Sequence, residues 1–402
     1  MTNQNNFIRV PYGSTVHGQE EINAVVEVLN TTTQMSKNVS EFESKVANLF
    51  DKKFGVMVNS GTSALYLSVE AMALPRGSEV ITPALTFATT VGCLVKNELI
   101  PAFVDVKENT YCVDEEKIEE KINDNTSAIC IPDLMGNLCN WKKIREIADK
   151  YGLKILHDSA DTIGAELNGV PVGRYSDISI TSFYGSHVIN GAGNGGMICT
   201  NNKDWAEKMK LLRSWGRSSS LFVESEAIEN RFNVELEGIT YDAKFVFEEI
   251  GYQLEPSEIS AAFALVQLKN LPKNIKSRQD NFASHNKFFS KYSDAFTLPQ
   301  ETEGAYTCWL AYPMLVSESA TFSRTDLQIF LEKRNIQTRV VFTGNILRQP
   351  GFKNINCIGK ADEFVNADRV MKQGILLACH HGLNKEMINH LYDSIDLFMS
   401  SH

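Results

Sequence analysis

The chain has no basic run, no long apolar stretch and no paired cysteines. Its 402 residues carry 39 basic and 49 acidic side chains, a formal net charge of −10. Nucleic-acid binding needs clustered lysine and arginine, so nucleic acid is not an expected partner. No run of 18 apolar residues occurs, and the first thirty residues are polar, with no apolar core flanked by basic residues. These absences argue against a membrane or secreted protein, and we expect a cytoplasmic one.

The eight cysteines are scattered, and no two of them stand in a Cys-x-x-Cys pair. Most lie in apolar, strand-like runs, as Cys130 and Cys199 do. This pattern is typical of free buried thiols in a reducing compartment. We therefore expect neither a disulfide framework nor a structural metal.

Short β-branched runs alternate with amphipathic helical stretches from about residue 54. Residues 141–151, for example, place Ile144, Ile147 and Ala148 on one helical face. The alternation predicts an α/β fold with a mostly parallel sheet covered on both faces. The predicted strands are 55–59, 79–83, 102–106, 128–132 and 154–157.

The alternation breaks at residues 218–246, a polar stretch that predicts a surface excursion. Beyond Pro256 the pattern changes to a helix, a long polar helical run, and then strand, helix, strand and helix. We predict a large domain at 1–255, with an N-terminal arm, and a smaller α+β domain at 256–402. Upstream, Ser40 and Glu43 have the spacing of a capping box and predict a helix start there.

A small polar turn, from Ser60 to Ser63, joins an apolar strand to a helix. Backbone N–H groups at a helix start bind phosphate well, although serine and threonine also cap helices that bind nothing. A glycine-rich segment at 191–196 has the Gly-x-Gly-x-x-Gly spacing. It runs into a strand, whereas a dinucleotide fingerprint opens a helix, so we reject that interpretation.

Two polar residues follow predicted strands. Asp158 ends the strand at 154–157, at the edge where open α/β sheets bind ligands. It could pair with a cation such as a protonated pyridine nitrogen, or cap a helix, and Asp161 beyond it is interpreted as structural. His187 lies on a loop after the strand at 177–181, and a lone histidine is more often structural than catalytic.

The order of these motifs resembles the pyridoxal-phosphate-dependent nucleotide-sugar aminotransferases and dehydratases, over nearly the whole chain. The resemblance implies a fold-type I, aspartate-aminotransferase-like fold. His187 stands where the aminotransferases have the lysine that bonds to the cofactor. A histidine at this position is typical of the 3-dehydratase branch, which this chain therefore resembles. The branch includes CDP-4-keto-6-deoxyglucose 3-dehydrase and GDP-4-keto-6-deoxymannose 3-dehydratase. Further motifs that carry the resemblance are Thr82–Phe87, Leu134–Asn137, Trp215–Arg217 and Phe342–Pro350.

The resemblance also implies a role for each matched residue. Phe87 would stack on the pyridine ring, Asp158 would pair with its nitrogen, and His187 would be the catalytic base. The cofactor phosphate would be held by Gly61, Thr62 and Ser182. An asparagine of the family reaches this phosphate from the neighbouring subunit, and Gln253 stands in its place, so a homodimer is expected.

Two departures from the family pattern matter. The CDP-sugar enzyme holds an iron–sulfur cluster on four cysteines. The glycine-rich loop is one residue longer than the pattern, with Asn194 where a glutamate is usual, which would reshape the sugar pocket. Because cluster irons need thiolates, we expect no cluster here. The positions that match the four cysteines are Ala160, Ser219, Leu221 and Glu229.

The predicted function is C3 dehydration of a nucleotide-linked 4-keto-6-deoxyhexose with pyridoxamine 5'-phosphate, for 3,6-dideoxysugar biosynthesis. His187 would act as a base with a pKa near neutrality, and an amino acid such as glutamate would restore the amine. The nucleotide, CDP, GDP or dTDP, stays open. Two alternatives remain: a sugar aminotransferase that works despite His187, and an inactive paralogue that binds pyridoxal phosphate or a sugar nucleotide.

Overall fold

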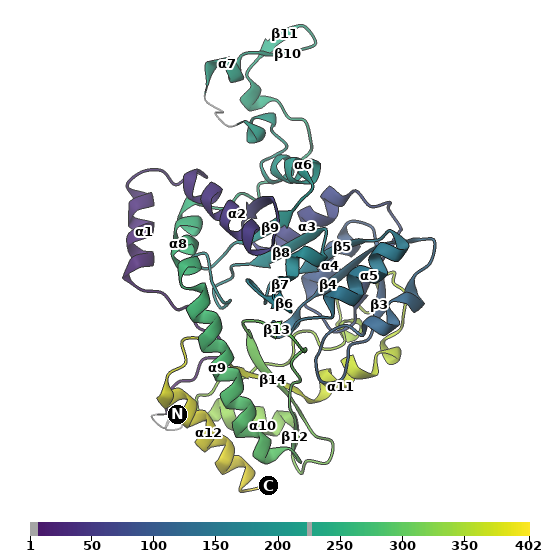
Figure 1. Ribbon diagram of the computed structural model, residues 1–402, viewed down its shortest axis with the longest axis vertical. Coiled ribbons are helices and arrows are strands. Elements are labelled where there is room, and N and C mark those ends of the chain that lie inside the picture. Colours follow the sequence, from purple (N-terminus) through teal and green to yellow (C-terminus); the bar gives the residue numbers. More distant parts are fainter. Residues whose placement is uncertain (1–6, 223–226) are drawn as a thin grey trace.

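The computed structural model describes residues 7–222 and 227–402. At its centre lies a seven-stranded sheet with the order β1-β9-β8-β5-β4-β2-β3 (Figure 1). Its strands run parallel except β9, which is antiparallel to both β1 and β8. The chain thus has the fold-type I fold that the sequence predicts. The bounds are β1 Phe54–Val58, β2 Glu79–Pro83, β3 Ile100–Val104, β4 Thr126–Pro132, β5 Lys154–Asp158, β8 Ile178–Ser182 and β9 Gly196–Thr200.

The predicted strand at 79–83 matches β2, and the other predicted strands differ from the observed ones by one or two residues at an end. Their alternating side chains build two cores. On one face Cys130 and Leu156 pack with α3, α4 and α6, and on the other Ile129 and Ile155 pack with α5. Burial of both faces explains why these strands are continuously apolar. These helices are α3 Gly61–Met72, α4 Ala88–Lys96, α5 Trp141–Tyr151 and α6 Lys203–Arg213.

Helix α2 (Lys37–Leu49) begins before the predicted capping box, so that prediction is wrong. The first turn is capped by Glu258, whose carboxylate accepts hydrogen bonds from Ser36 N at 2.8 Å and Asn38 N at 2.6 Å. Glu43 instead accepts from Met57 N at 2.8 Å and so joins α2 to the sheet. A carboxylate near a helix N-terminus also interacts favourably with the helix dipole.

Helix α8 (Glu258–Lys269) packs beside α1 (Gln19–Leu29) and α2. Helix α9 (Leu271–Phe289) continues from it, and Figure 1 shows α9 running down to a second, three-stranded sheet, β12-β14-β15. The domain boundary between residues 255 and 256 stays a prediction. The elements around the second sheet are β12 Phe296–Thr297, β14 Ala311–Val316, α10 Arg324–Lys333, α11 Val365–Gln373, β15 Gly374–Ala378 and α12 Lys385–Met399.

A short third sheet, β13-β6-β7, lies between the larger two. Its strands are β6 Glu166–Leu167, β7 Val170–Pro171 and β13 Ala305–Tyr306. Across residues 7–222 and 227–402, no helix has both the length and the apolar character that a membrane crossing needs.

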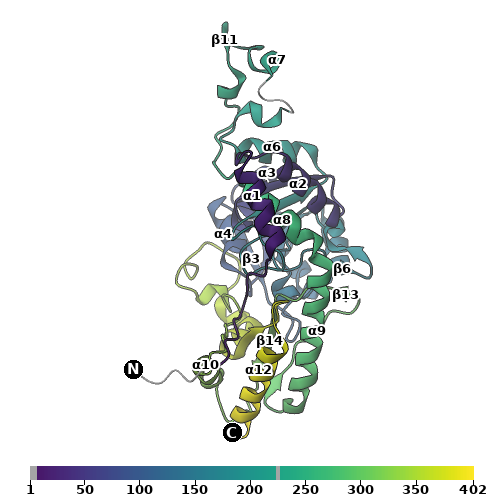
Figure 2. The ribbon, with the colours of Figure 1, turned by 90° about the vertical axis from the view of Figure 1, so that its left-hand side faces the viewer.

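The surface excursion predicted at 218–246 is confirmed for residues 227–246, which form most of a projecting arm that we define as residues 227–250, whereas residues 223–226 lie outside the described residues. It carries α7 (Ile228–Arg231), β10 (Val234–Leu236) and β11 (Ile239–Tyr241). Both views show it extending away from the rest of the chain (Figures 1 and 2). The arm exposes large apolar side chains that include Ile228, Phe232, Ile239, Phe245, Phe247 and Ile250.

Candidate active site

A cavity of about 380 Å³ opens at the carboxyl ends of β4, β5 and β8, beside the start of α3. Leu310 and Phe342, from the C-terminal part of the chain, close its other side. This edge is where open α/β sheets bind ligands. Six of the seven site residues that the sequence suggests line this cavity: Gly61, Thr62, Phe87, Asp158, Ser182 and His187.

The start of α3 forms one wall of the cavity. Ser60 caps the helix, because its Oγ accepts a hydrogen bond from Ser63 N at 3.0 Å. Gly61 lies so close to β8 that a Cβ in its place would come within 2.8 Å of the Ser182 Cβ. The glycine therefore lets the first helical turn and Ser182 meet at one point. Backbone N–H groups and a hydroxyl at a helix N-terminus suit a phosphate group.

Asp158 lies buried at the end of β5. Its carboxylate accepts hydrogen bonds from Thr90 Oγ1 at 2.8 Å and Ala160 N at 3.2 Å. Burial raises the pKa of Asp158, and these two hydrogen bonds oppose the rise. A buried carboxylate at a cavity wall is stabilised by a cation, and a protonated pyridine nitrogen fits that need.

Behind Asp158 a buried hydrogen-bond network fixes the ends of β4 and β5. His157 Nε2 lies 2.8 Å from Asp133 Oδ2, and both side chains are fully buried. Asp133 also accepts from Trp141 Nε1 at 2.9 Å, and Asp133 N donates to the Asp158 carbonyl at 3.1 Å. The network holds the backbone that carries Asp158, so the carboxylate has a fixed position.

Phe87 supplies an apolar surface beside the carboxylate. It stands just before α4, and the residue is 51% exposed although it lines the cavity. It meets Phe342 edge to face with the ring centroids 6.1 Å apart. A flat aromatic face that opens into a cavity suits stacking on a planar ring.

His187 lies on the loop after β8, where its Nδ1 is 2.8 Å from the Ala160 carbonyl. Because a carbonyl only accepts, Nδ1 carries the hydrogen and Nε2 carries the lone pair. Burial is the main cause that lowers the pKa of His187 to about 4; the Ala160 hydrogen bond opposes the shift, and the positive charge of Arg278 contributes to it. The expected pKa near neutrality is therefore wrong for this site, and the imidazole is a neutral base at pH 7.

Asp161 also lines the cavity, which the sequence did not lead us to expect. Its Oδ2 accepts a hydrogen bond from Met135 N at 2.9 Å. Burial is the main cause that raises the pKa of Asp161 to about 7; the Met135 hydrogen bond opposes the rise, and the charge of Asp158 contributes to it. The spacing Asp158-x-x-Asp161 was the available signal, since it puts a second acid just past the same strand end.

The glycine-rich loop contributes Asn194 and Gly195 to the cavity wall. The Asn194 carbonyl accepts a hydrogen bond from Ser260 Oγ at 2.9 Å, which anchors the loop to α8. Asn194, which stands where the family usually has a glutamate, therefore lies in the wall of the cavity.

Gln253 is the one suggested residue that does not line the cavity. It is exposed at the base of the arm, where its backbone pairs with Ser214. A single chain therefore brings together six of the seven residues and leaves Gln253 outside.

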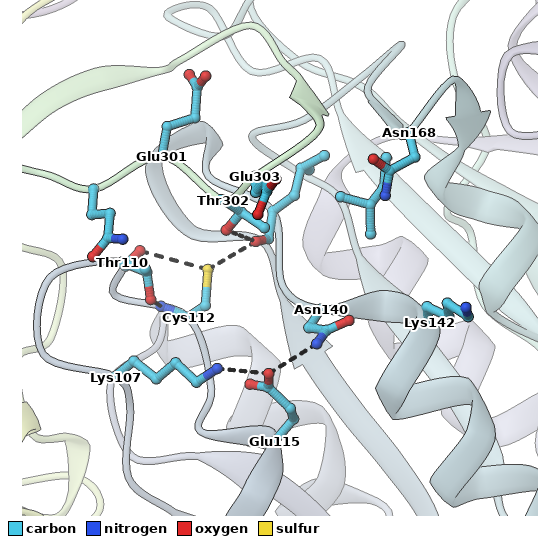
Figure 3. Close-up of a pocket in the computed structure, with 13 residues that line it drawn as sticks. Lys107, Thr110, Cys112, Glu115, Asn140, Lys142, Asn168, Glu301, Thr302 and Glu303 are labelled. Atoms are coloured by element: carbon cyan, nitrogen blue, oxygen red, sulfur yellow. Dashed lines mark hydrogen bonds and ion pairs between the residues drawn. The ribbon is translucent and has the colours of Figure 1, made fainter.

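A second pocket, of about 480 Å³, lies beside the loop that contains Lys107 and Glu115 (Figure 3). Lys107 Nζ is 2.6 Å from Glu115 Oε1, and Asn140 Nδ2 donates to the same oxygen at 3.1 Å. The thiol of Cys112, which also lines this pocket, donates to the Leu138 carbonyl at 3.2 Å. These polar groups are occupied with one another, so the site is assigned to the first cavity.

No group of three or more His, Cys, Asp or Glu side chains that could hold a metal occurs in the described part of the chain. The positions that match the cluster cysteines carry alanine, serine, leucine and glutamate. The absence of an iron–sulfur cluster stays a prediction.

A family model described as the DegT/DnrJ/EryC1/StrS aminotransferase family matches residues 16–396. The chain belongs to this family. The lipopolysaccharide biosynthesis protein RfbH of Salmonella typhimurium is 31% identical, with 97% of this chain and 91% of that protein covered. The dTDP-4-dehydro-2,6-dideoxy-D-glucose 3-dehydratase of Saccharopolyspora spinosa is also 31% identical, over 97% of this chain and 86% of that protein.

Among solved structures, the E. coli GDP-4-keto-6-deoxy-D-mannose-3-dehydratase with bound hydrated pyridoxal phosphate is similar, with a TM-score of 0.86. It is 27% identical, and the match covers 97% of this chain and all of that one. The similarity extends over both sheets, so the cavity lies within the shared fold.

Proposed function

We propose that this chain binds pyridoxamine 5'-phosphate and removes the C3 hydroxyl of a nucleotide-linked 4-keto-6-deoxyhexose. One observation carries the proposal: none of the described residues that line the cavity is a lysine, and His187 lies on the loop after β8 instead. Imidazole forms no stable covalent bond with an aldehyde cofactor. The cofactor is therefore held by noncovalent contacts and its amine stays available for the sugar ketone.

The residues of the cavity fit this cofactor. Gly61 and Thr62 at the start of α3, together with Ser182 at the end of β8, hold the phosphate, and Phe87 covers the ring. Asp158 pairs with the ring nitrogen and is itself oriented by Thr90. When bound, the cofactor supplies an amine that condenses with a ketone and a pyridinium ring that accepts electrons.

His187 moves the proton in this scheme. With the cofactor bound, Nε2 would accept a proton from the methylene carbon beside the cofactor amine, while the Ala160 carbonyl keeps the imidazole ring in place. The low pKa then makes the protonated imidazole a strong donor, which returns the proton to the departing C3 hydroxyl as water. Hydrolysis by water would then release the sugar as a 3,6-dideoxy-4-keto nucleotide together with ammonia. Glutamate, oxidised to 2-oxoglutarate, would restore the amine form and so supply the two electrons that removal of the C3 oxygen requires.

The position of Gln253 supports a shared site. Gln253 is absent from its own cavity, and the adjoining arm exposes Phe245, Phe247 and Ile250. Contiguous exposed apolar side chains mark interaction surfaces. We propose a symmetric dimer in which each arm lies against the second copy and each Gln253 reaches the other chain's cofactor phosphate. Cytoplasmic placement stays a prediction.

The family description favours one competing function, sugar transamination. Incubation with pyridoxamine phosphate, glutamate and a panel of CDP-, GDP- and dTDP-linked 4-keto-6-deoxy sugars tests the two together. Mass analysis of a dehydratase product finds one oxygen less than in the substrate. A new amino sugar would instead establish an aminotransferase, and absence of turnover with every sugar would favour an inactive binding protein.

A further inference from the structure

A groove of about 570 Å³ runs on from the cavity toward the outside of the molecule. Cavity and groove share four lining residues, Tyr12, Tyr184, Ser186 and Phe342, so they form one continuous cleft. The groove lies between the N-terminal segment and the strand-like segment at residues 337–342 of the C-terminal part. Val10 pairs with Ile336 at this junction.

The two parts of this cleft differ in charge. The cavity wall carries Asp133, Asp158 and Asp161 and no lysine or arginine among the described residues. The described residues of the groove wall include no carboxylate, and their only charged side chain is Arg339. A ligand that fills both parts therefore has its anionic group in the groove and not at the reacting end.

Arg339 is fixed through its backbone. Its N–H donates to the Leu376 carbonyl at 3.1 Å, and its carbonyl accepts from Leu376 N at 2.8 Å. Its guanidinium lies 5.4 Å from the centre of the Tyr12 ring.

Most of the hydrogen-bonding capacity of this guanidinium is unused. One Nη1 hydrogen donates to the Thr338 carbonyl at 2.7 Å, and no ion pair with Arg339 occurs in residues 7–222 and 227–402. A guanidinium has five N–H donors, so several remain for a ligand. Gln337 adds an amide group to the same wall, and its Oε1 is held by Tyr12 N at 3.1 Å.

We propose that Arg339 binds the diphosphate of the nucleotide-linked sugar. The inference rests on the proposed function, because a sugar ketone at His187 leaves the diphosphate one hexose ring away, on the side where the cleft continues. Two N–H groups of an arginine match two phosphate oxygens, which a lysine cannot do. The amino donor also carries carboxylates, so the experiment must separate the two anions.

Binding of nucleoside diphosphates without a sugar tests the inference. Affinities of GDP, CDP and dTDP are measured by calorimetry on the full chain loaded with pyridoxamine phosphate. We expect Arg339→Met to weaken the diphosphate that binds best by about 10- to 150-fold, the value of a charge-assisted hydrogen bond. Arg339→Lys should lose less of the affinity for this diphosphate than Arg339→Met does. Arg76→Met, which removes an exposed arginine paired with Glu98 outside both parts of the cleft, should change nothing.

Unchanged diphosphate affinity in Arg339→Met would overturn the inference. If that variant instead slowed only the glutamate-dependent formation of pyridoxamine phosphate, the arginine would belong to the amino donor, which also overturns it. The binding measurement needs no C3 chemistry. Loss of diphosphate affinity together with no deoxygenation of any sugar would therefore reject the proposed function and retain this inference.

Discussion

The cavity and the arm differ in which side chains they bury and which they expose. In the cavity, polar side chains are buried and held by partners of the same chain, as Asp158 is by Thr90 and His187 by Ala160. In the arm, apolar side chains stand in solvent, and Ile250 is 95% exposed. The cavity positions its polar side chains within one chain, whereas we propose that the arm packs against a second copy. Changes in the cavity should alter chemistry, and changes in the arm should alter association.

The largest effect is expected from His187→Lys. A lysine amine at this position would bond covalently to the cofactor, so dehydration should fall by about 10²- to 10⁴-fold, the usual contribution of a positioned acid–base group. Borohydride reduction followed by mass analysis should find the cofactor attached to the chain. His390→Lys, outside the cavity, serves as the control. A His187→Lys variant that neither traps cofactor nor loses dehydration would contradict the assignment.

Asp161→Asn tests the electrostatic cost that the cavity wall carries. The pKa of Asp161 is raised to about 7 in the folded chain, so between about pH 4 and pH 7 the folded state holds a proton that the unfolded state has lost. Stability from this group is present at low pH and falls as pH rises to about 7. The asparagine avoids the loss, and its carbonyl oxygen can still accept from Met135 N.

We therefore expect the free energy of unfolding of Asp161→Asn to exceed that of wild type by on the order of 1–4 kcal/mol at pH 8, and by little at pH 4. Urea unfolding at the two pH values measures the difference. The exposed Asp294, replaced by asparagine, is the matched control. An equal difference between wild type and variant at both pH values would show that Asp161 does not carry this cost.

Gln253→Ala examines the link between arm and cavity. If Gln253 donates to the phosphate of a second copy, its loss should weaken pyridoxamine phosphate binding by about 10- to 150-fold while the dimer persists. The effect should be easy to detect because His187 gives no covalent tether. Gln253→Asn should stay near wild type. Equilibrium dialysis with light scattering measures both properties, and unchanged affinity or a monomeric active enzyme would reject the shared site.

The smallest effect is expected from Ile250→Ser. Full burial of one isoleucine is worth about 1.5–3 kcal/mol, and the lower end of that range corresponds to a rise of about tenfold in the dimer dissociation constant. Unfolding of the chain itself should not change, because the side chain is exposed within one chain. Sedimentation at decreasing protein concentration gives the constant. An unaltered constant would place this part of the arm outside the interface.

The sequence predicts best what depends on neighbouring residues. Strand β2, helix α5 and the position of Asp158 at a strand end follow from local apolar patterns. The start of α2 does not, because its cap is Glu258, more than 200 residues away. A contact between residues so far apart in the sequence produces no local motif from which the helix start could be predicted.

The same limit applies to the site. His187 stands out because it replaces an expected lysine, but its lowered pKa depends on burial and on Arg278, which packing alone brings near. Asp161 lies one short turn beyond Asp158, and only the fold turns it toward the cavity. The groove with Arg339 combines segments from both ends of the chain, so no motif signals it.

The central claim is that the C3 oxygen leaves the sugar, and an oxygen label tests it most directly. A 4-keto-6-deoxy sugar nucleotide labelled with ¹⁸O at C3 is incubated with the chain, pyridoxamine phosphate and glutamate, and the label is followed by mass spectrometry. The account predicts that the label appears in water with wild type and stays on the sugar with His187→Lys. An amino sugar from wild type that retains the label would contradict it.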